Sequence, residues 1–354
     1  MEKVLMKGNE AIAEAAIQAG CKYFFGYPIT PQNEIPAYMA KKLPKIGGIF
    51  LQAESEVAAI NMVYGAAGAG ARVMTSSSSP GISLKQEGIS YIAGAALPCV
   101  IVNIVRGGPG LGGIQPAQSD YFQSVKGGGH GDYHLIVYAP STLQEMVSLT
   151  MEAFDVADIY RNPVMVLGDG MLGQMMEPVE FVKPPVRELP NKDWATTGCD
   201  GIRKPNVINS LYIDPEELEK EVNKTYEKYK LIKEKETRYE IYNCDEAEII
   251  VVAYGTTSRI IKSVIENANE EGIKVGLIRP ITIWPFPYEP IEKYANKDNV
   301  KGFLTVEMSM GQMVEDVKLG VNGKKEVFFH GRTGGMVPTP DDIMNEIRRI
   351  VREG

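Results

Sequence analysis

Short apolar runs and helical patterns alternate along roughly the first half of the chain. Continuous apolar runs of strand length occupy residues 22–26, 48–52, 72–76, 99–105, 135–138 and 164–167. Between them, apolar residues recur at helical spacing in residues 9–19, 55–70 and 141–160. Asn9 is the expected N-cap of the first helix and Gly20 its stop signal. Buried strands separated by helices predict a parallel sheet covered on both faces, with a ligand beyond the carboxyl ends of the strands.

A break in this pattern separates the first α/β unit from the rest. Residues 184–209 are rich in Pro, Asn and Gly and predict a linker, and residues 214–240 are highly charged. Asp214 followed by Pro215 predicts a helix start, and five apolar residues fall on one face of that helix: Leu218, Val222, Tyr226, Tyr229 and Ile232. This pattern is typical of a solvated amphipathic helix that lies over the protein. A partner contact is the alternative.

A second α/β unit begins near Ala247. Residues 248–255 and 275–280 are predicted strands joined by a helix over 257–271, and a further strand over 302–308 precedes a closing helix over 341–352. The fold class is therefore α/β throughout. Three segments are expected: residues 1–183 as the first domain, 184–245 as linker and charged helix, and 246–354 as a smaller second domain.

Composition narrows the class of protein. The chain is 44% hydrophobic and 23% charged, which is typical of a soluble globular protein, and its net charge of −8 argues against nucleic acid or an anionic membrane as partner. The N-terminal residues lack the apolar core of a signal peptide. The longest apolar stretch, residues 91–105, is broken by Pro98 and Asn103 and is too short to span a bilayer. A cytoplasmic location is expected.

Cysteines and histidines give no sign of a metal centre. Cys21, Cys99, Cys199 and Cys244 are scattered without paired spacing, so we expect no iron–sulfur cluster and no metal site on this chain. His130 lies in a glycine-rich loop that is able to reach a cleft, but a structural or solvent-exposed role is the simpler interpretation. Residues 107–113 (GGPGLGG) lack the glycine spacing of a dinucleotide-binding fingerprint.

Two neighbouring carboxylates, Glu54 and Glu56, precede a run of small residues. Thiamine diphosphate chemistry needs a carboxyl group at N1′ of the aminopyrimidine, followed by small residues that allow close approach. Gly65 follows Glu56 by nine residues, the spacing of the pyrimidine-domain glutamate in the thiamine enzymes that this segment resembles, and Glu54 lacks that spacing. Ser55 is able to cap the helix and place Glu56 in its first turn, where a glutamate needs no catalytic role. Both interpretations stay open on this motif alone.

Five further motifs make this resemblance specific to one family, because they occur in the order in which that family carries them. They are GYPITP at 26–31, MTSSSSPGISLKQEG at 74–88, IVNIVRGGPG at 101–110, RPITIWPFP at 279–287 and VEMSMGQM at 306–313. Together they resemble the alpha subunits of the 2-oxoacid:ferredoxin oxidoreductases over almost the whole chain. The resemblance implies a thiamine diphosphate pyrimidine-binding domain followed by a domain like the transketolase C-terminal domain.

The resemblance also implies roles for particular side chains. Glu56 matches the pyrimidine-binding glutamate, Thr30 the threonine that contacts substrate and the cofactor region, and Arg106 the arginine that binds the substrate carboxylate. A loop hydroxyl and a surface ion pair are the ordinary alternatives for Thr30 and Arg106. Residues 76–79 form a polar loop that is able to bind the aminopyrimidine, although capping of the following helix is the favoured interpretation.

Gly168-Asp169-Gly170 looks like the start of a Mg²⁺–diphosphate motif. No asparagine pair completes it, since Asn191 stands alone in a proline-rich tract, so a turn at the end of a strand is the expected role. The chain is therefore expected to hold the pyrimidine half of the site. A beta subunit is expected to supply the Mg²⁺–diphosphate half, and gamma and ferredoxin-like subunits the iron–sulfur clusters.

The implied activity is oxidative decarboxylation of a 2-oxoacid to an acyl-coenzyme A, with electrons passed to ferredoxin. Among the family's branches, the motifs are most similar to the 3-methyl-2-oxobutanoate enzymes. The loop over Ile114, Gln115 and Pro116 adds no cation for a distal carboxylate, which favours an apolar substrate over 2-oxoglutarate. A 2-oxoglutarate enzyme and a noncatalytic scaffold subunit are the alternatives. The role of the segment from Glu307 to Gln312 is left open.

Overall fold

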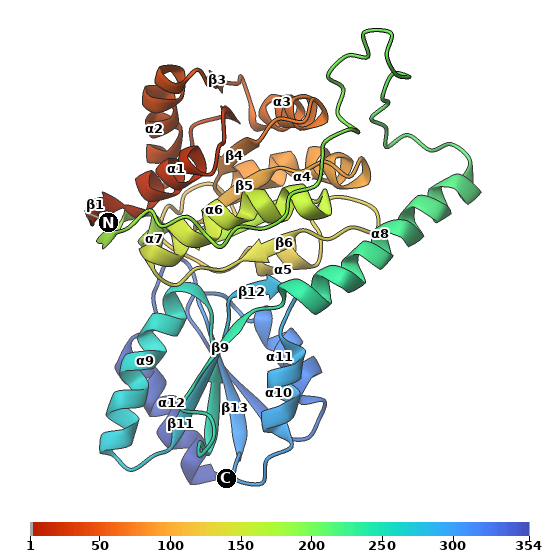
Figure 1. The fold of residues 1–354 in the computed structure, drawn as a ribbon. Coiled ribbons are helices and arrows are strands. Elements are labelled where there is room, and N and C mark those ends of the chain that lie inside the picture. Colours follow the sequence, from red (N-terminus) through yellow and green to blue (C-terminus); the bar gives the residue numbers. More distant parts are fainter. Residues whose placement is uncertain (1–2, 354) are drawn as a thin grey trace.

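The computed structural model describes residues 3–353. The chain folds into two α/β domains, each a sheet covered by helices, which we call the upper and the lower layer from their places in Figure 1. The upper sheet has seven strands, which in spatial order are β12 (Thr282–Trp284), β6 (Ile136–Tyr138), β7 (Val164–Asp169), β5 (Val100–Val105), β4 (Val73–Ser77), β2 (Tyr23–Gly26) and β3 (Ile49–Gln52). All neighbouring strands from β6 to β3 are parallel. The predicted α/β class and the six predicted strands of this sheet are confirmed.

Helices cover both faces of the upper sheet. On one face α1 (Gly8–Gln18) packs against α2 (Glu34–Lys42) and α6 (Leu143–Tyr160), and on the other α3 (Glu56–Gly68) packs against α4 (Ser79–Gly94). This division follows from right-handed crossovers between parallel strands whose order reverses along the sheet. Shorter elements complete this layer: β1 (Val4–Lys7), a 3₁₀ helix (Leu43–Ile46), α5 (Tyr121–Val125), α7 (Gly170–Gln174) and β8 (Met176–Val179), which pairs antiparallel with β1.

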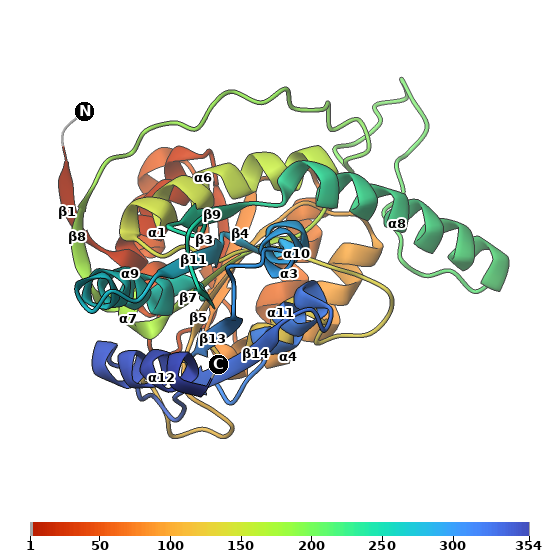
Figure 2. The ribbon, with the colours of Figure 1, turned by 90° about the horizontal axis from the view of Figure 1, so that it is seen from below.

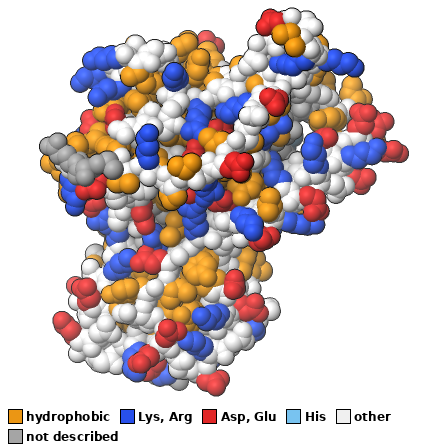
Figure 3. Space-filling model, viewed as in Figure 1, with side chains coloured by type: hydrophobic (Ala, Val, Ile, Leu, Met, Phe, Trp, Pro, Cys, Tyr) orange, Lys and Arg blue, Asp and Glu red, His pale blue; other side chains and the backbone are white. Residues whose placement is uncertain are grey.

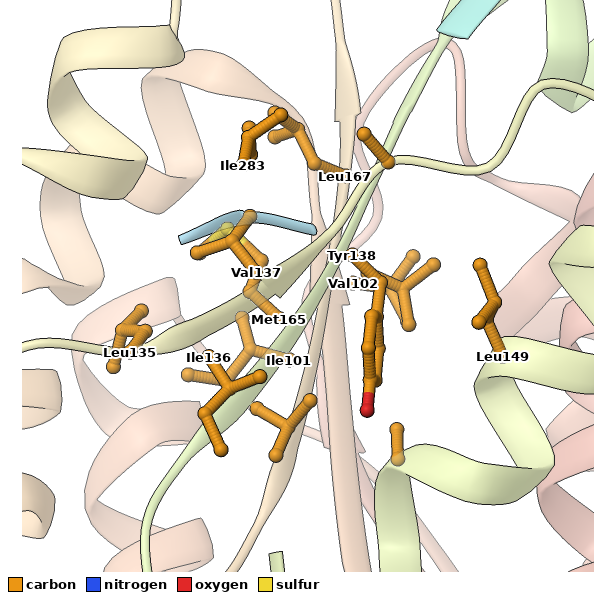
Figure 4. Packing of buried hydrophobic residues seen from close by; sticks show 14 of the residues in the cluster. Ile101, Val102, Leu135, Ile136, Val137, Tyr138, Leu149, Met165, Leu167 and Ile283 are labelled. Carbon is orange, nitrogen blue, oxygen red and sulfur yellow. The ribbon is translucent and has the colours of Figure 1, made fainter. Parts of the chain in front are cut away.

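The core of the upper layer lies at the centre of this sheet. Figure 4 shows Ile101 and Val102 of β5 packed near Met165 of β7 and Val137 of β6, with Ile283 of β12 beside them. All five side chains are fully buried. The continuous apolar runs in the sequence are therefore strands covered on both faces, as such runs predict.

The lower layer is a five-stranded sheet with two helices on each face. Its strands in spatial order are β14 (Glu326–Gly331), β13 (Gly302–Glu307), β10 (Ile249–Val252), β11 (Val275–Pro280) and β9 (Tyr239–Tyr242). One face carries α9 (Gly255–Glu270) packed against α12 (Pro340–Glu353), and the other carries α10 (Tyr288–Ala295) packed against α11 (Met313–Val321). The predicted βαβ unit of β10, α9 and β11 is confirmed.

Two strands lie outside the segments that the sequence analysis assigned to their sheets. Residues 239–242, placed in the linker and charged helix, form β9, an antiparallel edge strand of the lower sheet. Residues 282–284, placed in the second domain, cross over as β12 and pair antiparallel with β6 of the upper sheet. Both are short edge strands. The sheet that each joins is set by pairing with a strand distant in the sequence, which local patterning does not reveal.

The start of α1 differs from the expectation in one respect. Lys7 is the N-cap, and Asn9 lies inside the first turn. The buried Asn9 amide instead donates to the carbonyl oxygen of Pro31 and to a carboxylate oxygen of Glu34, both at 2.8 Å. Asn9 therefore ties α1 to the loop that follows β2.

The charged helix α8 (Pro215–Glu236) is capped as predicted, because Asp214 accepts the backbone N–H groups of Glu216 and Glu217. Its apolar face is buried only at the C-terminal end. Tyr229 and Ile232 are fully covered, whereas Leu218 is 45% exposed. The N-terminal half projects from the molecule, and Figure 3 shows acidic and basic side chains gathered at its tip. The prediction of a helix lying over the protein is thus correct for one half of it.

This division predicts unequal effects of two matched substitutions on one helix face. Ile232→Ala is expected to lower the free energy of unfolding by about 2–5 kcal/mol, because it removes a fully buried side chain. Leu218→Ala is expected to change it by no more than about 0.5 kcal/mol. Urea unfolding monitored by circular dichroism measures both. Equal effects would mean that the N-terminal half of α8 also packs on the body of the protein.

Candidate active site at the carboxyl ends of four neighbouring strands

The residues singled out from the sequence lie at one edge of the upper sheet. Thr30 follows β2, Glu56 follows β3, Ser77 ends β4 and Arg106 follows β5, and these four strands are neighbours in the sheet. The carboxyl ends of parallel strands meet at the same edge, where α/β sheets bind their ligands. The structure therefore brings these four residues together at one edge of the sheet, and we call them the strand-end cluster. Glu56 and Arg106 lie on its two outer strands.

Glu56 is a buried carboxylate without a hydrogen-bond partner. Ser55 caps α3 through the backbone N–H of Ala58 (3.2 Å), as predicted, which places Glu56 in the first turn with 6% of its surface exposed. Within residues 3–353 no group hydrogen-bonds or ion-pairs with its side chain. Burying a carboxylate without a partner is costly, so a side chain in this state is ready to receive a ligand. Glu54, by contrast, is exposed.

Gly81, in the first turn of α4, forms the floor beneath Glu56. A Cβ atom at this position would lie 2.6 Å from Oε1 of Glu56 and 2.0 Å from Oγ of Ser77. Any side chain here would therefore displace the carboxylate. Glycine at this position therefore allows the Glu56 side chain to lie close to α4.

The serines of residues 76–79 do not all act as expected. Ser78 is the N-cap residue of α4, yet its side chain makes no capping bond, so the favoured capping interpretation is wrong for it. The hydroxyl groups of Ser77 and Ser78 are both buried and lack a hydrogen-bond partner among the described residues. Ser76 donates to Oε1 of Gln32, and Ser79 accepts the backbone N–H of Arg106 at 3.1 Å. The unpaired Ser77 hydroxyl lies beside the Glu56 carboxylate, since a Cβ atom on Gly81 would approach both.

Arg106 is 7% exposed and is held by backbone carbonyl groups. Its Nη1 donates to the carbonyl oxygen of Thr30 at 2.8 Å and its Nη2 to that of Leu111 at 3.5 Å, while Nε is buried without a partner. In the described part of the chain no carboxylate pairs with the guanidinium, so the alternative of a surface ion pair is wrong. A buried cation without a counter-charge favours an anionic ligand.

Thr30 contributes to this arrangement mainly through its backbone. Its side chain is exposed, and Oγ1 accepts a long hydrogen bond of 3.4 Å from Asn33. It lines an open hollow of about 560 Å³ together with Ile114, Gln115 and Val337. The hollow lies between the loop after β2, the loop after β5 and the lower layer.

Lys85 is a site residue that the sequence analysis missed. It is fully buried on α4, and its Nζ donates to Oγ1 of Thr75 at 2.7 Å and to the carbonyl oxygen of Ser76 at 2.9 Å. Burial lowers the pKa of Lys85 to about 7, and the nearby charge of Glu56 acts in the opposite direction. The sequence signal for Lys85 was its spacing from Gly81. The two residues are one helical turn apart and therefore lie on one face of α4.

Asp169 holds the two layers together. Its Oδ1 accepts the backbone N–H groups of Met171 and Leu172 at the start of α7, and its Oδ2 accepts the hydroxyl of Thr256 on α9. Burial raises the pKa of this carboxyl group. Both oxygens are thus engaged within the protein. Among residues 3–353 no group of three or more acidic, histidine or cysteine side chains is arranged to hold a metal ion.

The segment from Glu307 to Gln312, whose role was left open, joins the layers as well. Glu307 accepts the backbone N–H groups of Gln312 and Met313 at 3.1 and 3.0 Å and so caps the start of α11. The amide of Gln312 donates to the carbonyl oxygen of Ser119 at 2.8 Å. This segment therefore orders the loop between Arg106 and α5 and does not enter the strand-end cluster.

His130 lies away from the cluster. It is exposed, its Nδ1 is 3.3 Å from Oγ of Ser90, and its ring meets the edge of Tyr91. It lines a groove of about 710 Å³ between α4 and the projecting half of α8, and neither Glu56 nor Arg106 lines that groove. The interpretation of His130 as an exposed side chain agrees with this position.

Comparisons with known proteins agree with the fold. Residues 14–238 match the family described as "Pyruvate flavodoxin/ferredoxin oxidoreductase, thiamine diP-bdg". Residues 247–343 match "Pyruvate:ferredoxin oxidoreductase core domain II". The chain is 51% identical over 353 residues to the ketoisovalerate oxidoreductase subunit VorB of Methanothermobacter marburgensis, covering 100% of this chain and 99% of that protein.

Two solved structures show the same fold. The 2-oxoglutarate:ferredoxin oxidoreductase of Magnetococcus marinus superposes with a TM-score of 0.86 at 27% identity, over 99% of this chain and 65% of that chain. This chain therefore spans about two thirds of that longer polypeptide. A split-gene transketolase matches with a TM-score of 0.61 at 12% identity, over 98% of each chain, which shows a shared fold alone.

The chain belongs to the thiamine-diphosphate-binding pyruvate flavodoxin/ferredoxin oxidoreductase family. Within it, the chain is the alpha, pyrimidine-domain subunit of a 2-oxoacid:ferredoxin oxidoreductase, so the resemblance seen in the sequence is confirmed. No helix in the described range is long and apolar enough to cross a membrane.

Proposed function

We propose that this chain supplies the pyrimidine-binding half of an active site that oxidatively decarboxylates 3-methyl-2-oxobutanoate to its acyl-coenzyme A. The observation that carries the proposal is the buried Glu56 carboxylate, which faces Gly81 and has no hydrogen-bond partner in residues 3–353. The unpaired hydroxyl of Ser77 beside it suits the polar edge of an aminopyrimidine. These residues fit the pyrimidine end of thiamine diphosphate.

Each residue of the cluster has a distinct task in this proposal. When bound, thiamine diphosphate supplies the nucleophilic carbon and the electron sink that decarboxylation needs. Glu56 holds a proton at N1′ of the pyrimidine, in a site from which Gly81 and the ends of the strands exclude water. Arg106 binds the substrate carboxylate through two parallel hydrogen bonds and fixes its orientation. Thr30 supports Arg106 with its carbonyl oxygen and faces the substrate hollow.

Partner subunits complete the enzyme in this proposal. The Mg²⁺–diphosphate half is assigned to a beta subunit, because Asp169 is fully engaged in holding α7 and α9 and no metal-ligating group is found in the described part of the chain. The iron–sulfur clusters are assigned to gamma and ferredoxin-like subunits, with coenzyme A and ferredoxin as further partners. Burial raises the pKa of the Cys21, Cys99 and Cys244 thiols to about 12, which disfavours thiolate ligands.

A cytoplasmic location belongs to the same proposal. All four cysteines are free thiols, as in proteins of reducing compartments.

The choice of substrate rests on the hollow beside Thr30. None of its lining side chains is Lys, Arg or His, and the Glu34 carboxylate in its wall is already paired with Lys7 at 3.2 Å. A second carboxylate, as in 2-oxoglutarate, would find no cation among these lining side chains, whereas Ile114 and Val337 offer apolar contact to a branched side chain. The 51% identity to a ketoisovalerate oxidoreductase subunit supports the same choice over the 2-oxoglutarate enzyme.

Reconstitution with the partner subunits tests the proposed function. With coenzyme A and a ferredoxin surrogate under anaerobic conditions, kcat/KM for 3-methyl-2-oxobutanoate is expected to exceed that for 2-oxoglutarate by at least about 10²-fold, since a desolvated unpaired carboxylate costs several kcal/mol. A preference for 2-oxoglutarate would reverse the substrate assignment. A complex that keeps full activity without this chain would make it a scaffold subunit.

A further inference from the structure

A cavity of about 330 Å³ lies on the far side of the upper layer from the strand-end cluster. It is lined by the C-terminal ends of α4 and α6, by residues 207–209 of the linker and by α8 where this helix begins to project from the body of the protein (Figure 1). The strands that follow α4 and α6 are β5 and β7, so the cavity lies near the amino ends of these strands. It is therefore separate from the proposed active site at their carboxyl ends.

Three basic side chains line this cavity: Arg161, Lys224 and Lys228. Among its lining residues one is acidic, Glu221, which pairs with Lys224 at 3.5 Å. Lys224 and Lys228 are one turn apart on α8, a spacing at which like charges repel. In residues 3–353 no carboxylate lies within ion-pair distance of Arg161 or Lys228. The cavity therefore carries more positive charge than these residues neutralise.

Backbone carbonyl groups at the ends of α4 and α6 hold two of the cations in place. Nε of Arg161 donates to the carbonyl oxygen of Ala96 at 3.0 Å, and the guanidinium lies 4.3 Å from the ring centroid of Trp194. Nζ of Lys228 donates to the carbonyl oxygen of Arg161 at 3.2 Å. These carbonyl groups carry only partial negative charge. Burial, together with the charges of Arg161 and Lys224, lowers the pKa of Lys228 to about 8, as a cation without a counter-ion requires.

We propose that this cavity is a binding site for a phosphate group. Arg161, Lys224 and Lys228 outnumber the one lining carboxylate by two, and a phosphate monoester carries a charge of about −1.5 to −2 at pH 7. Arginine and lysine are the side chains that bind phosphate oxygens by charge-assisted hydrogen bonds. Ile208 and Tyr212 extend the wall beyond the cations, so the cavity has room for a small organic group attached to the phosphate. The inference goes beyond the proposed function and does not depend on it.

The site is testable on the full chain by NMR. The protein is labelled with ε-¹³C lysine and titrated with acid and base in inorganic phosphate and in KCl of equal ionic strength. A bound anion favours the protonated form of Lys228, so its midpoint is expected to be higher in phosphate by about 1 pH unit. Lys85, which is fully buried and outside this cavity, is the internal control and is expected to have the same midpoint in both salts. Equal Lys228 midpoints in phosphate and KCl overturn the proposal.

Two substitutions test which cations bind the phosphate. Arg161→Met removes a charge-assisted hydrogen bond and is expected to weaken phosphate binding at least about 10-fold, as followed by the Lys228 signal. Lys224→Met is expected to weaken it by about 2- to 5-fold, because this lysine is exposed. Lys220→Met is the matched control, since Lys220 is an exposed lysine one turn earlier on α8 that does not line the cavity, and its replacement is expected to leave binding unchanged.

If Arg161→Met does not fold, Lys224→Met against Lys220→Met decides the question, because both lysines are exposed on one helix. Phosphate binding as in the wild type in both cavity variants overturns the proposal. A second titration with AMP distinguishes the sources of the phosphate group. Tighter binding of AMP than of inorganic phosphate assigns the site to a phosphate ester, and equal or weaker binding assigns it to free phosphate. Failure of both probes to shift the Lys228 signal means that the cavity is no phosphate site.

Discussion

Glu56→Gln is expected to lower kcat of the reconstituted complex on the order of 10²- to 10⁴-fold, the usual range for loss of a general acid–base group. An amide is nearly the same size as a carboxyl group but exchanges no proton at N1′ of the pyrimidine. The substitution also removes a buried carboxylate that has no partner in residues 3–353, so the isolated chain is expected to become no less stable. Steady-state reduction of a ferredoxin surrogate gives kcat, and thermal unfolding gives the stability.

Glu54→Gln is the matched control. Glu54 lies two residues away on the same segment but is exposed, so its replacement is expected to leave kcat within about twofold of wild type. A larger loss for Glu54→Gln than for Glu56→Gln would show that the assignment between the two carboxylates is wrong.

Arg106→Ala is expected to lower kcat/KM for the 2-oxoacid. The expected loss corresponds to roughly 2–5 kcal/mol of transition-state stabilisation, the cost of removing one partner of a desolvated charge pair. Arg106→Lys is expected to raise KM and also lower kcat, because lysine supplies a point charge where the planar guanidinium fixes orientation. The affinity for thiamine diphosphate is expected to stay near wild type in both variants. Steady-state kinetics against 2-oxoacid concentration, performed anaerobically, measures these effects.

Arg203→Ala is the control for Arg106. Arg203 is an exposed arginine that also donates to backbone carbonyl groups, including that of Gly198 at 2.7 Å, but lies outside the strand-end cluster. Unchanged substrate kinetics in Arg106→Ala would mean that the substrate carboxylate is held elsewhere, and a partner subunit would then be the place to search.

Much of the fold was predictable because its strands are continuous apolar runs. The six predicted strands of the upper sheet and the βαβ unit of the lower sheet were found. The strands β9 and β12 were missed, since each is a short edge strand and the charged or proline-rich sequence around it hides the pattern. Pairing across more than a hundred residues, as between β12 and β6, is set by the packing of whole layers.

The site was predictable where a residue type and a spacing coincided. Glu56 stood in the first turn of a predicted helix and Arg106 at the end of a predicted strand, and the structure shows Glu56 buried without a hydrogen-bond partner in residues 3–353 and Arg106 buried without a carboxylate partner there. Lys85 was missed, because a lysine in a helix is ordinarily exposed. Its burial depends on how α4 lies across β4. The unpaired hydroxyl of Ser78 likewise depends on the exact path of the chain into α4.

We propose that this chain holds only the pyrimidine half of the thiamine site. Isothermal calorimetry of thiamine diphosphate with the isolated chain, with and without Mg²⁺, tests it most directly. We expect weak or undetectable binding that Mg²⁺ does not strengthen, because Asp169 is engaged with α7 and Thr256, and tight Mg²⁺-dependent binding only after the beta subunit is added. Tight Mg²⁺-dependent binding to the isolated chain would contradict the claim and return Asp169 to a metal-binding role.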